Sequence, residues 1–114
     1  MVTIKISQSL IKELIRRFPK EKAHKAIDLM ESLKIDPHKG KLLGVVGAIS
    51  IKELKFEGFR FYFIFDGYAL QTFDEKKIVD LLFQFVRMSN KKEQQRTINQ
   101  IKGVLRKIGP SGFK

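Results

Sequence analysis

Residues that could bind a phosphate group and move a proton lie close together between positions 53 and 62. Lys55 and Arg60 supply two cations, and an arginine beside a lysine suits a phosphate or a carboxylate. Glu53 adds a carboxylate and Tyr62 adds a phenol. Residue chemistry alone leaves two interpretations open: a solvated network of charged side chains, or an anion site.

A β-hairpin would place these four side chains on one surface. The glycine of Glu57–Gly58 tolerates the positive φ of a two-residue turn. That turn pairs Lys55 with Arg60 and Glu53 with Tyr62, because alternate residues of a strand point to opposite faces. The opposite face collects an apolar layer of Leu54, Phe56, Phe59, Phe61, Phe63 and Phe65. One face is therefore predicted to be core, and the other a small charged surface.

Apolar spacing predicts a strand and two helices before this hairpin. Residues Val2–Ile6 alternate as a strand does. Ser7 suits the N-cap of a first helix, and Pro19 suits the start of a second. The helical stripes contain Leu10, Ile11, Leu14, Ile15, Phe18, Ala23, Ala26, Ile27, Met30 and Leu33. The turn-rich segment Asp36–Gly40 is expected to end the helical pair.

Two more strands and a basic helix are predicted after the hairpin. A turn at Asp66–Gly67 leads to a strand over Tyr68–Phe73, and a further turn leads to a last strand over Lys77–Met88. A helix is expected over Lys91–Ile108, after a break and N-cap at Ser89–Asn90. Its inward residues are Ile98, Ile101, Leu105 and Ile108, and its exposed side offers Arg96, Lys102, Arg106 and Lys107.

These elements define an α+β fold in a single domain spanning residues 1–114. Two N-terminal helices are expected to pack on a twisted antiparallel β-meander that is followed by a basic C-terminal helix. A chain of 114 residues can bury one core but not two independent ones.

Net charge points to a polyanionic partner. Twenty-three lysines and arginines against 12 acidic residues give a formal charge of +11. Such a chain is predisposed to bind nucleic acid, a ribosome, an acidic protein or a membrane surface. From Ser89 onward Glu93 is the one acidic residue among many basic ones, which favours nucleic acid.

Composition also argues against several classes of protein. There is no cysteine, and His24 and His38 are fourteen positions apart, so no disulfide framework, metal site or other cofactor is expected. No apolar run approaches the roughly 20 residues that span a bilayer, and the N-terminus lacks the organisation of a signal peptide. The sequence therefore predicts a soluble, cytoplasmic protein that makes no membrane contact.

Four segments together resemble the RelE/ParE toxin superfamily, and in particular its HigB or phage Gp49-like branch. These are a glutamate strand at Ile51–Lys55, an aromatic-arginine strand at Phe59–Tyr62, a strand at Leu81–Phe85, and a basic run into a helix through Arg87, Lys91, Lys92 and Ile98. The resemblance covers most of the chain. No segment within it is as specific as a nucleotide-binding fingerprint.

The resemblance implies a ribosome-dependent mRNA endonuclease that an antitoxin protein silences. In such an enzyme the RNA 2′-hydroxyl attacks the adjacent phosphate and leaves a 2′,3′-cyclic phosphate, without a metal. Carried over by position, Lys55, Arg60 and Arg87 would face the phosphate, and Glu53 would act as base or acid. The alternation of the last strand places Arg87 on the core face, however. Further contacts to nucleic acid are expected from Lys52, Tyr62, Lys91, Lys92, Arg96, Lys102 and Arg106, with Lys52 ranked below Lys55 because it faces the core.

One departure from the superfamily leaves the activity open. Many active members carry a catalytic Tyr or His near the C-terminus, whereas this C-terminal segment offers only Phe113. A non-catalytic toxin of the ParE type, which binds a protein such as DNA gyrase, therefore remains an alternative. So does a basic module that binds nucleic acid or the ribosome without catalysis. The sequence does not indicate an oligomeric state.

Overall fold

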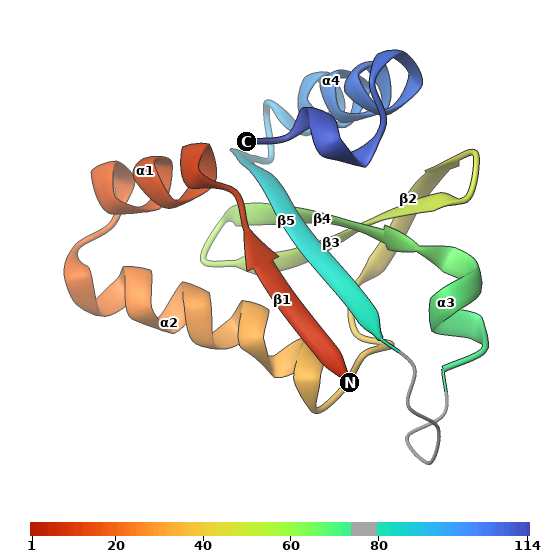
Figure 1. Ribbon diagram of the computed structural model, residues 1–114. Helices are drawn as coiled ribbons and strands as arrows, with labels where there is room; N and C mark the ends of the chain where they lie inside the picture. The colour runs from red at the N-terminus through yellow and green to blue at the C-terminus, as the bar shows by residue number, and fades with distance from the viewer. Residues whose placement is uncertain (74–79) are drawn as a thin grey trace.

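The computed structural model of the protein describes residues 1–73 and 80–114, and these build a five-stranded mixed sheet with helices on both faces (Figure 1). The strands are β1 (Val2–Ile6), β2 (Lys41–Val46), β3 (Ile49–Phe56), β4 (Phe59–Asp66) and β5 (Leu81–Asn90). Their order in the sheet is β1-β5-β4-β3-β2. β1 runs parallel to β5, and the other neighbours are antiparallel.

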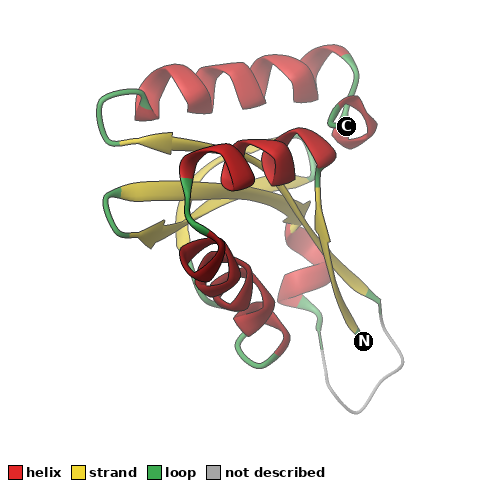
Figure 2. Cartoon of the chain, turned by 90° about the vertical axis from the view of Figure 1, so that its left-hand side faces the viewer, coloured by secondary structure: helices red, strands yellow, loops and turns green. Residues whose placement is uncertain are grey.

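Four α-helices accompany the sheet in the described part of the chain. They are α1 (Gln8–Arg17), α2 (Lys20–Glu31), α3 (Gly67–Gln71) and α4 (Gln94–Lys107), with short 3-10 turns η1 (Ser32–Lys34) and η2 (Pro110–Gly112). Figure 2 shows the strands lying between α4 and α2. The described helices contain none that is long and apolar enough to cross a membrane.

Local sequence signals explain where the first two helices begin. The Ser7 hydroxyl accepts a hydrogen bond from the Leu10 backbone N–H at 3.4 Å, which confirms Ser7 as the N-cap of α1. Pro19 is the N-cap of α2, so the helical pair restarts at Pro19 as predicted.

The first core fills the space between the sheet and the helical pair. It includes the phenylalanine layer of the β3–β4 hairpin, which confirms the face predicted to be apolar. The other buried members come from α1, α2, α3, η1 and β5: Leu10, Leu14, Phe18, Ala23, Ala26, Met30, Leu33, Leu70, Leu81, Phe83, Phe85 and Met88.

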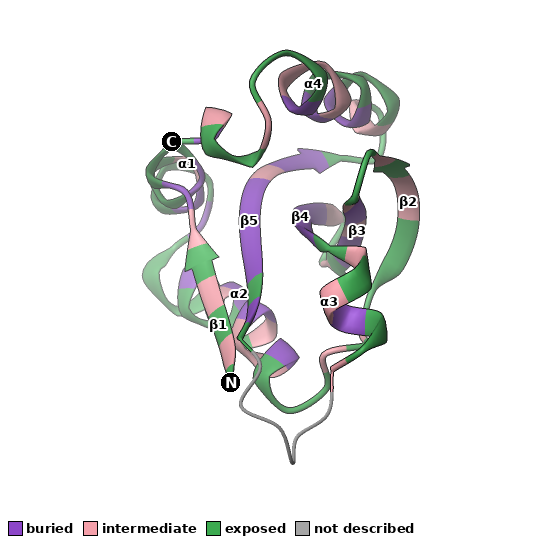
Figure 3. Cartoon of the chain, turned by 45° about the vertical axis from the view of Figure 1, so that its right-hand side comes forward, coloured by how far each residue is buried: buried purple, intermediate pink, exposed green. Residues whose placement is uncertain are grey.

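A second core lies on the opposite face, under α4. Ile98, Ile101 and Leu105 pack there as predicted, whereas Ile108 is 67% exposed. Their partners from the sheet and the C-terminal segment are Ile51, Tyr62, Ile64, Val86 and Phe113. Figure 3 shows β5 buried along most of its length, because it is covered from both sides. The face predicted to be a charged surface is therefore largely covered.

The predicted antiparallel meander is wrong in three respects. Residues 68–73 do not form a strand: the Asp66 carboxylate accepts hydrogen bonds from the N–H groups of Tyr68 and Ala69 and so caps α3. The sheet is mixed, because β1 pairs in parallel with β5. Strand β2 was not predicted, and it forms the edge beyond β3.

Two element boundaries also differ from the prediction. The last strand begins at Leu81 and runs through Asn90, so Ser89–Asn90 is not a break. Val79 and the predicted turn before it lie outside the described residues. The last helix begins at Gln94 with Glu93 as its N-cap, and Asn90 caps the preceding turn by accepting from the Glu93 N–H at 2.9 Å.

Candidate nucleic-acid interface

The β3–β4 turn sets the geometry of the candidate site. Glu57 and Gly58 have φ angles of 46° and 83°, the positive values that a tight two-residue hairpin turn uses. The register is as predicted, with Lys55 opposite Arg60 and Glu53 opposite Tyr62. These four residues therefore share the face of the sheet that α4 covers.

Strand β5 extends this face into two rows across three strands. The row nearer the turn holds Lys55, Arg60 and Ser89, and the next row holds Glu53, Tyr62 and Arg87. Neighbouring strands lie about 4.8 Å apart, so each row spans roughly 10 Å. The four residues predicted to be catalytic thus lie in two adjacent rows.

Arg87 reaches this face through a β-bulge. The pairing of β5 with β4 shifts between Tyr62 and Phe63, which makes Val86 an extra residue in β5. Val86 packs in the second core, Arg87 then pairs with Tyr62, and Met88 returns to the first core. Strict alternation, which places Arg87 on the phenylalanine face, is therefore wrong.

Glu53 and Arg60 form a buried ion pair under the start of α4. Their side chains are 1% and 10% exposed, and the Glu53 Oε2 atom lies 3.7 Å from the Arg60 Nε atom. Glu53 Oε2 also accepts a hydrogen bond from the Gln94 side-chain amide of α4 at 3.0 Å. Glu53 Oε1 and Arg60 Nε have no hydrogen-bond partner among the described residues. In this conformation neither side chain is open to a substrate, whereas Lys55 is exposed.

Tyr62 lies inside the second core and not on the surface. Its side chain is fully buried, and its hydroxyl lies 2.7 Å from the Ser89 hydroxyl. Burial raises the pKa of Tyr62, and the hydrogen bond with Ser89 opposes that shift. A ring in this position cannot stack on a base, which corrects the prediction that Tyr62 contacts nucleic acid.

A polar groove of about 320 Å³ opens where α1, the end of β5 and α4 meet. It contains one arginine from each element: Arg17 of α1, Arg87 of β5 and Arg96 of α4. Its other lining residues are Glu13, Met88, Ser89, Asn90, Glu93, Thr97 and Gln100. We call it the arginine groove. Arg17 was not singled out in the sequence, because nothing local places α1 beside β5.

Carboxylates neutralise two of the three arginines. Arg17 Nε lies 2.9 Å from Glu13, and Arg96 Nη2 lies 3.1 Å from Glu93. Arg87 has no acidic partner among the described residues. It donates to the Val86 carbonyl at 2.7 Å, and its guanidinium carbon lies 5.1 Å from the centre of the Phe113 ring. Arg87 is therefore the arginine of the groove whose charge no described carboxylate neutralises.

The remaining predicted nucleic-acid contacts are dispersed. Lys52 lies on the first-core face, where its ammonium donates to the His38 carbonyl at 3.3 Å and lies 5.4 Å from the Phe65 ring centre. Burial lowers the pKa of Lys52, and the Asp36 charge opposes that shift. The other basic residues precede α4 or lie along it, and all but the half-buried Lys102 are exposed: Lys91, Lys92, Lys102 and Arg106. Lys102 runs close to Gly44 of β2.

Groups of three or more histidine, aspartate or glutamate side chains that could hold a metal ion do not occur among the described residues.

The arrangement of strands and helices is that of the RelE-like α+β fold. The protein is similar in structure to a chain of the archaeal RelE–RelB complex from Pyrococcus horikoshii, with a TM-score of 0.58 and 14% sequence identity. The similarity covers 79% of this chain and 94% of that chain. No protein-family model matches the sequence, and a search of curated proteins gives no match. At this identity the likeness shows the fold alone.

Proposed function

We propose that this protein is the toxin of a type II toxin–antitoxin system and cleaves messenger RNA on the ribosome. Residues 1–114 would act as one RelE-like domain, of the HigB or phage Gp49-like branch, in the cytoplasm. The observation that carries the proposal is an arginine, Arg87, that has no acidic partner among the described residues and lines a polar groove in a RelE-like fold. RNA offers that groove a phosphate, and the net charge of +11 favours such a partner.

The proposed reaction is attack of a 2′-hydroxyl on the adjacent phosphate, which yields a 2′,3′-cyclic phosphate and a free 5′-hydroxyl. Arg87 binds the phosphate through paired hydrogen bonds and stabilises the extra negative charge of the transition state. Lys55, exposed at the end of the nearer row, supplies a second cation. No step of this kind requires a metal or an organic cofactor.

Glu53 and Arg60 join this reaction only when α4 moves. Both side chains are buried, and the hydrogen bond from Gln94 in the first turn of α4 holds Glu53 in place. Movement of that turn would expose a carboxylate that can accept the 2′-hydroxyl proton and a guanidinium that can bind the phosphate.

An apolar groove between α1 and α2 supports the antitoxin part of the proposal. It has a volume of about 450 Å³, and Ile15 on its rim is 68% exposed. Lys20 and His24 also line it. The matching partner is an amphipathic, acidic segment of an antitoxin, because apolar side chains would fill the groove and carboxylates would meet its basic rim.

Mapping new 5′ ends of cellular messages after induced expression tests the proposal. The wild-type protein should halt growth and create new 5′ ends within translated messages. Arg87→Ala should lower cleavage roughly 100-fold, the loss typical when one group that stabilises the transition state is removed. Arg16→Ala, an exposed arginine of α1 outside the groove, is the matched control and should cleave normally.

The burial of Glu53 and Arg60 favours one alternative, a non-catalytic toxin of the ParE type. Among the described residues, the arginine groove is lined by no histidine or tyrosine that could carry a proton. Such a toxin would halt growth without new 5′ ends, and replacing the exposed Lys55 by alanine would leave the inhibition intact. A basic binding module without toxicity would give no inhibition, with binding that weakens steeply as salt increases.

A further inference from the structure

A largely buried glutamine, whose amide has no hydrogen-bond partner among the described residues, lies in the middle of the sheet. Gln84 of β5 is 7% exposed and is flanked by Lys5 of β1 and Ile64 of β4. Its carboxamide makes no hydrogen bond to any residue that the structure describes. Buried amides usually have partners, because leaving them unpaired costs the hydrogen bonds that water would supply. Gln84 is not among the fully enclosed side chains that lack a partner, so its amide reaches the adjoining cavity, where water or a ligand can bond to it.

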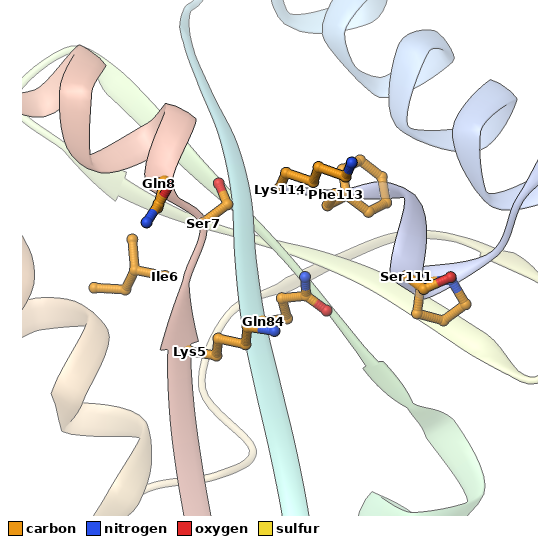
Figure 4. Close-up of a pocket in the computed structure, with 9 residues that line it drawn as sticks. Lys5, Ile6, Ser7, Gln8, Gln84, Ser111, Phe113 and Lys114 are labelled. Atoms are coloured by element: carbon orange, nitrogen blue, oxygen red, sulfur yellow. The ribbon is translucent and has the colours of Figure 1, made fainter.

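The carboxamide faces a cavity of about 610 Å³ (Figure 4). The cavity lies between the junction of β1 with α1 and the C-terminal segment, and we call it the Gln84 cavity. It is lined by Lys5, Ile6, Ser7, Gln8, Gln84, Pro110, Ser111, Phe113 and Lys114. A single water molecule occupies only about 30 Å³ of liquid. The space is the size of a small-molecule pocket.

Positive charge gathers around this cavity. Lys5 lies beside Gln84 in the sheet, and the exposed Lys5 and Lys114 side chains make no ion pair with described residues. Helix α1 begins at the cavity, where the Lys114 backbone oxygen accepts hydrogen bonds from the Ser9 N–H at 3.4 Å and the Ser9 hydroxyl at 2.9 Å. The helix N-terminus is therefore already occupied, and the two lysine ammonium groups are what would favour an anion next to the amide.

The Gln84 cavity and the arginine groove meet at one aromatic ring. Phe113 lines the cavity, and the guanidinium of Arg87, which lines the groove, lies 5.1 Å from the centre of that ring. The cavity lies at Gln84 and the groove lies at the end of β5, so both spaces border the same strand. From Gln84 to Asn90 the strand advances about 20 Å. One extended strand of nucleic acid could therefore occupy both.

We propose that the Gln84 cavity is a nucleotide subsite in which the Gln84 carboxamide recognises a base of single-stranded RNA while Lys5 and Lys114 bind its phosphate. The inference rests on the proposed function, because it takes the substrate of the arginine groove to be RNA. A carboxamide donates and accepts at once, so it can pair with the edge of an unstacked base and reject a base with a different pattern. Gln84 is then a specificity-determining residue.

Binding of short 2′-O-methyl RNA oligonucleotides tests the subsite. These probes lack the nucleophile, so binding is measured whether or not the protein cleaves RNA. Four sets of oligonucleotides, each enriched in one base, are titrated with the wild-type protein, and fluorescence anisotropy measures their binding. The affinities of the best and the worst set should differ at least fivefold. Gln84→Leu, which keeps the volume and removes the amide, should reduce these differences to less than twofold. Its thermal midpoint should not fall, because the amide has no described partner to lose.

Lys5→Ala provides a second, independent variant. This variant should weaken the binding of all four oligonucleotide sets by a similar factor, because it removes a phosphate contact and no base contact. For the same reason the affinity should depend less steeply on salt. Lys25→Ala, an exposed lysine of α2, is the matched control and should change neither quantity. In the ¹⁵N spectrum, the side-chain amide of Gln84 should shift when the preferred probe is added.

Two results would overturn the inference. One is equal binding of all four sets by the wild-type protein, or a base preference that Gln84→Leu leaves unchanged. The other is RNA binding in which the Gln84 amide signal does not move, which would mean that water alone fills the cavity. If the wild-type protein cleaves no RNA but binds the four sets with a base preference that Gln84→Leu abolishes, the nuclease proposal fails and the nucleotide subsite is supported.

Discussion

At the scale of single residues, Glu53 and Arg60 show that a charged side chain suited to catalysis can instead be buried in an ion pair. Both were chosen from the sequence as catalytic candidates, and both lie under α4 as a buried ion pair. Desolvating two charges is expensive, and a pair at 3.7 Å with two unpartnered polar atoms recovers only part of that free energy. Such a pair is retained for activity or for structural specificity, and stability measurements can separate the two roles.

Arg60→Met should destabilise the fold by about 3 kcal/mol, because it leaves the Glu53 carboxylate buried without a cation. The double variant Glu53→Leu/Arg60→Met removes both charges and should recover most of that loss. Urea denaturation at neutral pH measures both free energies of unfolding.

Growth inhibition by the double variant then separates the two roles. A stable double variant that no longer inhibits growth would assign the pair to activity. If the double variant were as unstable as Arg60→Met, the attribution of the loss to an uncompensated carboxylate would be refuted.

At the scale of elements, the β3–β4 hairpin depends on one backbone conformation. Gly58 has a φ of +83°, and a Cβ there would meet nothing within 4 Å, so only backbone strain opposes a side chain. Gly103 of α4 has equally open space and no positive φ. These two glycines form a matched pair.

Gly58→Ala should lower the free energy of unfolding by about 1 kcal/mol, the usual penalty for a side chain in the left-handed region. Gly103→Ala should raise it by about 0.5–1 kcal/mol, because alanine favours the helix. Thermal unfolding of both variants measures these changes. Equal effects at the two positions would show that turn strain does not hold the hairpin register.

The same scale separates what the sequence could predict from what it could not. The hairpin register and the start of α1 were predictable, because Glu57–Gly58 and Ser7 act on residues within a few positions of themselves. The bulge at Val86 was signalled only by an interrupted alternation between Phe85 and Met88. The pair Asp66–Gly67 predicts a hairpin turn, whereas in the structure Asp66 caps α3, because an Asp-Gly pair suits both a turn and a helix N-terminus.

Long-range packing decided the remaining differences. Strand β2 follows a turn-rich segment and carries two exposed apolar residues, so its pairing with β3 stabilises it more than its own pattern does. The burial of the charged face depends on α4, whose apolar stripe indicates a helix but not the surface that it covers. For this reason the sequence predicts that Lys55, Arg60, Glu53 and Tyr62 share one face of the sheet, but it does not predict that α4 covers most of that face.

At the scale of the whole molecule, the fold gathers distant segments around β5. The parallel pairing with β1 brings the start of α1 to β5, and the second core brings α4 to its other side. The arginine groove lies between these two helices, and the Gln84 cavity lies farther along β5, between the start of α1 and the C-terminal segment. Residues as far apart in sequence as Lys5, Arg87 and Lys114 thereby line neighbouring spaces along one strand.

This surface should bind single-stranded RNA with a strong dependence on salt. Each neutralised phosphate contributes a slope of about −0.7 to a plot of log affinity against log salt concentration. Arg87→Ala should make the slope shallower by about 0.7, because Arg87 has no competing carboxylate. Arg17→Ala should change it less, since Glu13 already neutralises much of that charge.

Titrations of an uncleavable 2′-O-methyl RNA at several salt concentrations would measure these slopes, with Arg16→Ala as the control that keeps the wild-type value. The net charge of +11 predicts that every variant still binds RNA at low salt. The variants are therefore compared by the slope of their salt dependence and not by whether they bind. A slope that Arg87→Ala leaves at the wild-type value would mean that no phosphate lies against Arg87. RNA would then bind elsewhere on the basic surface, and the arginine groove would lose its proposed role.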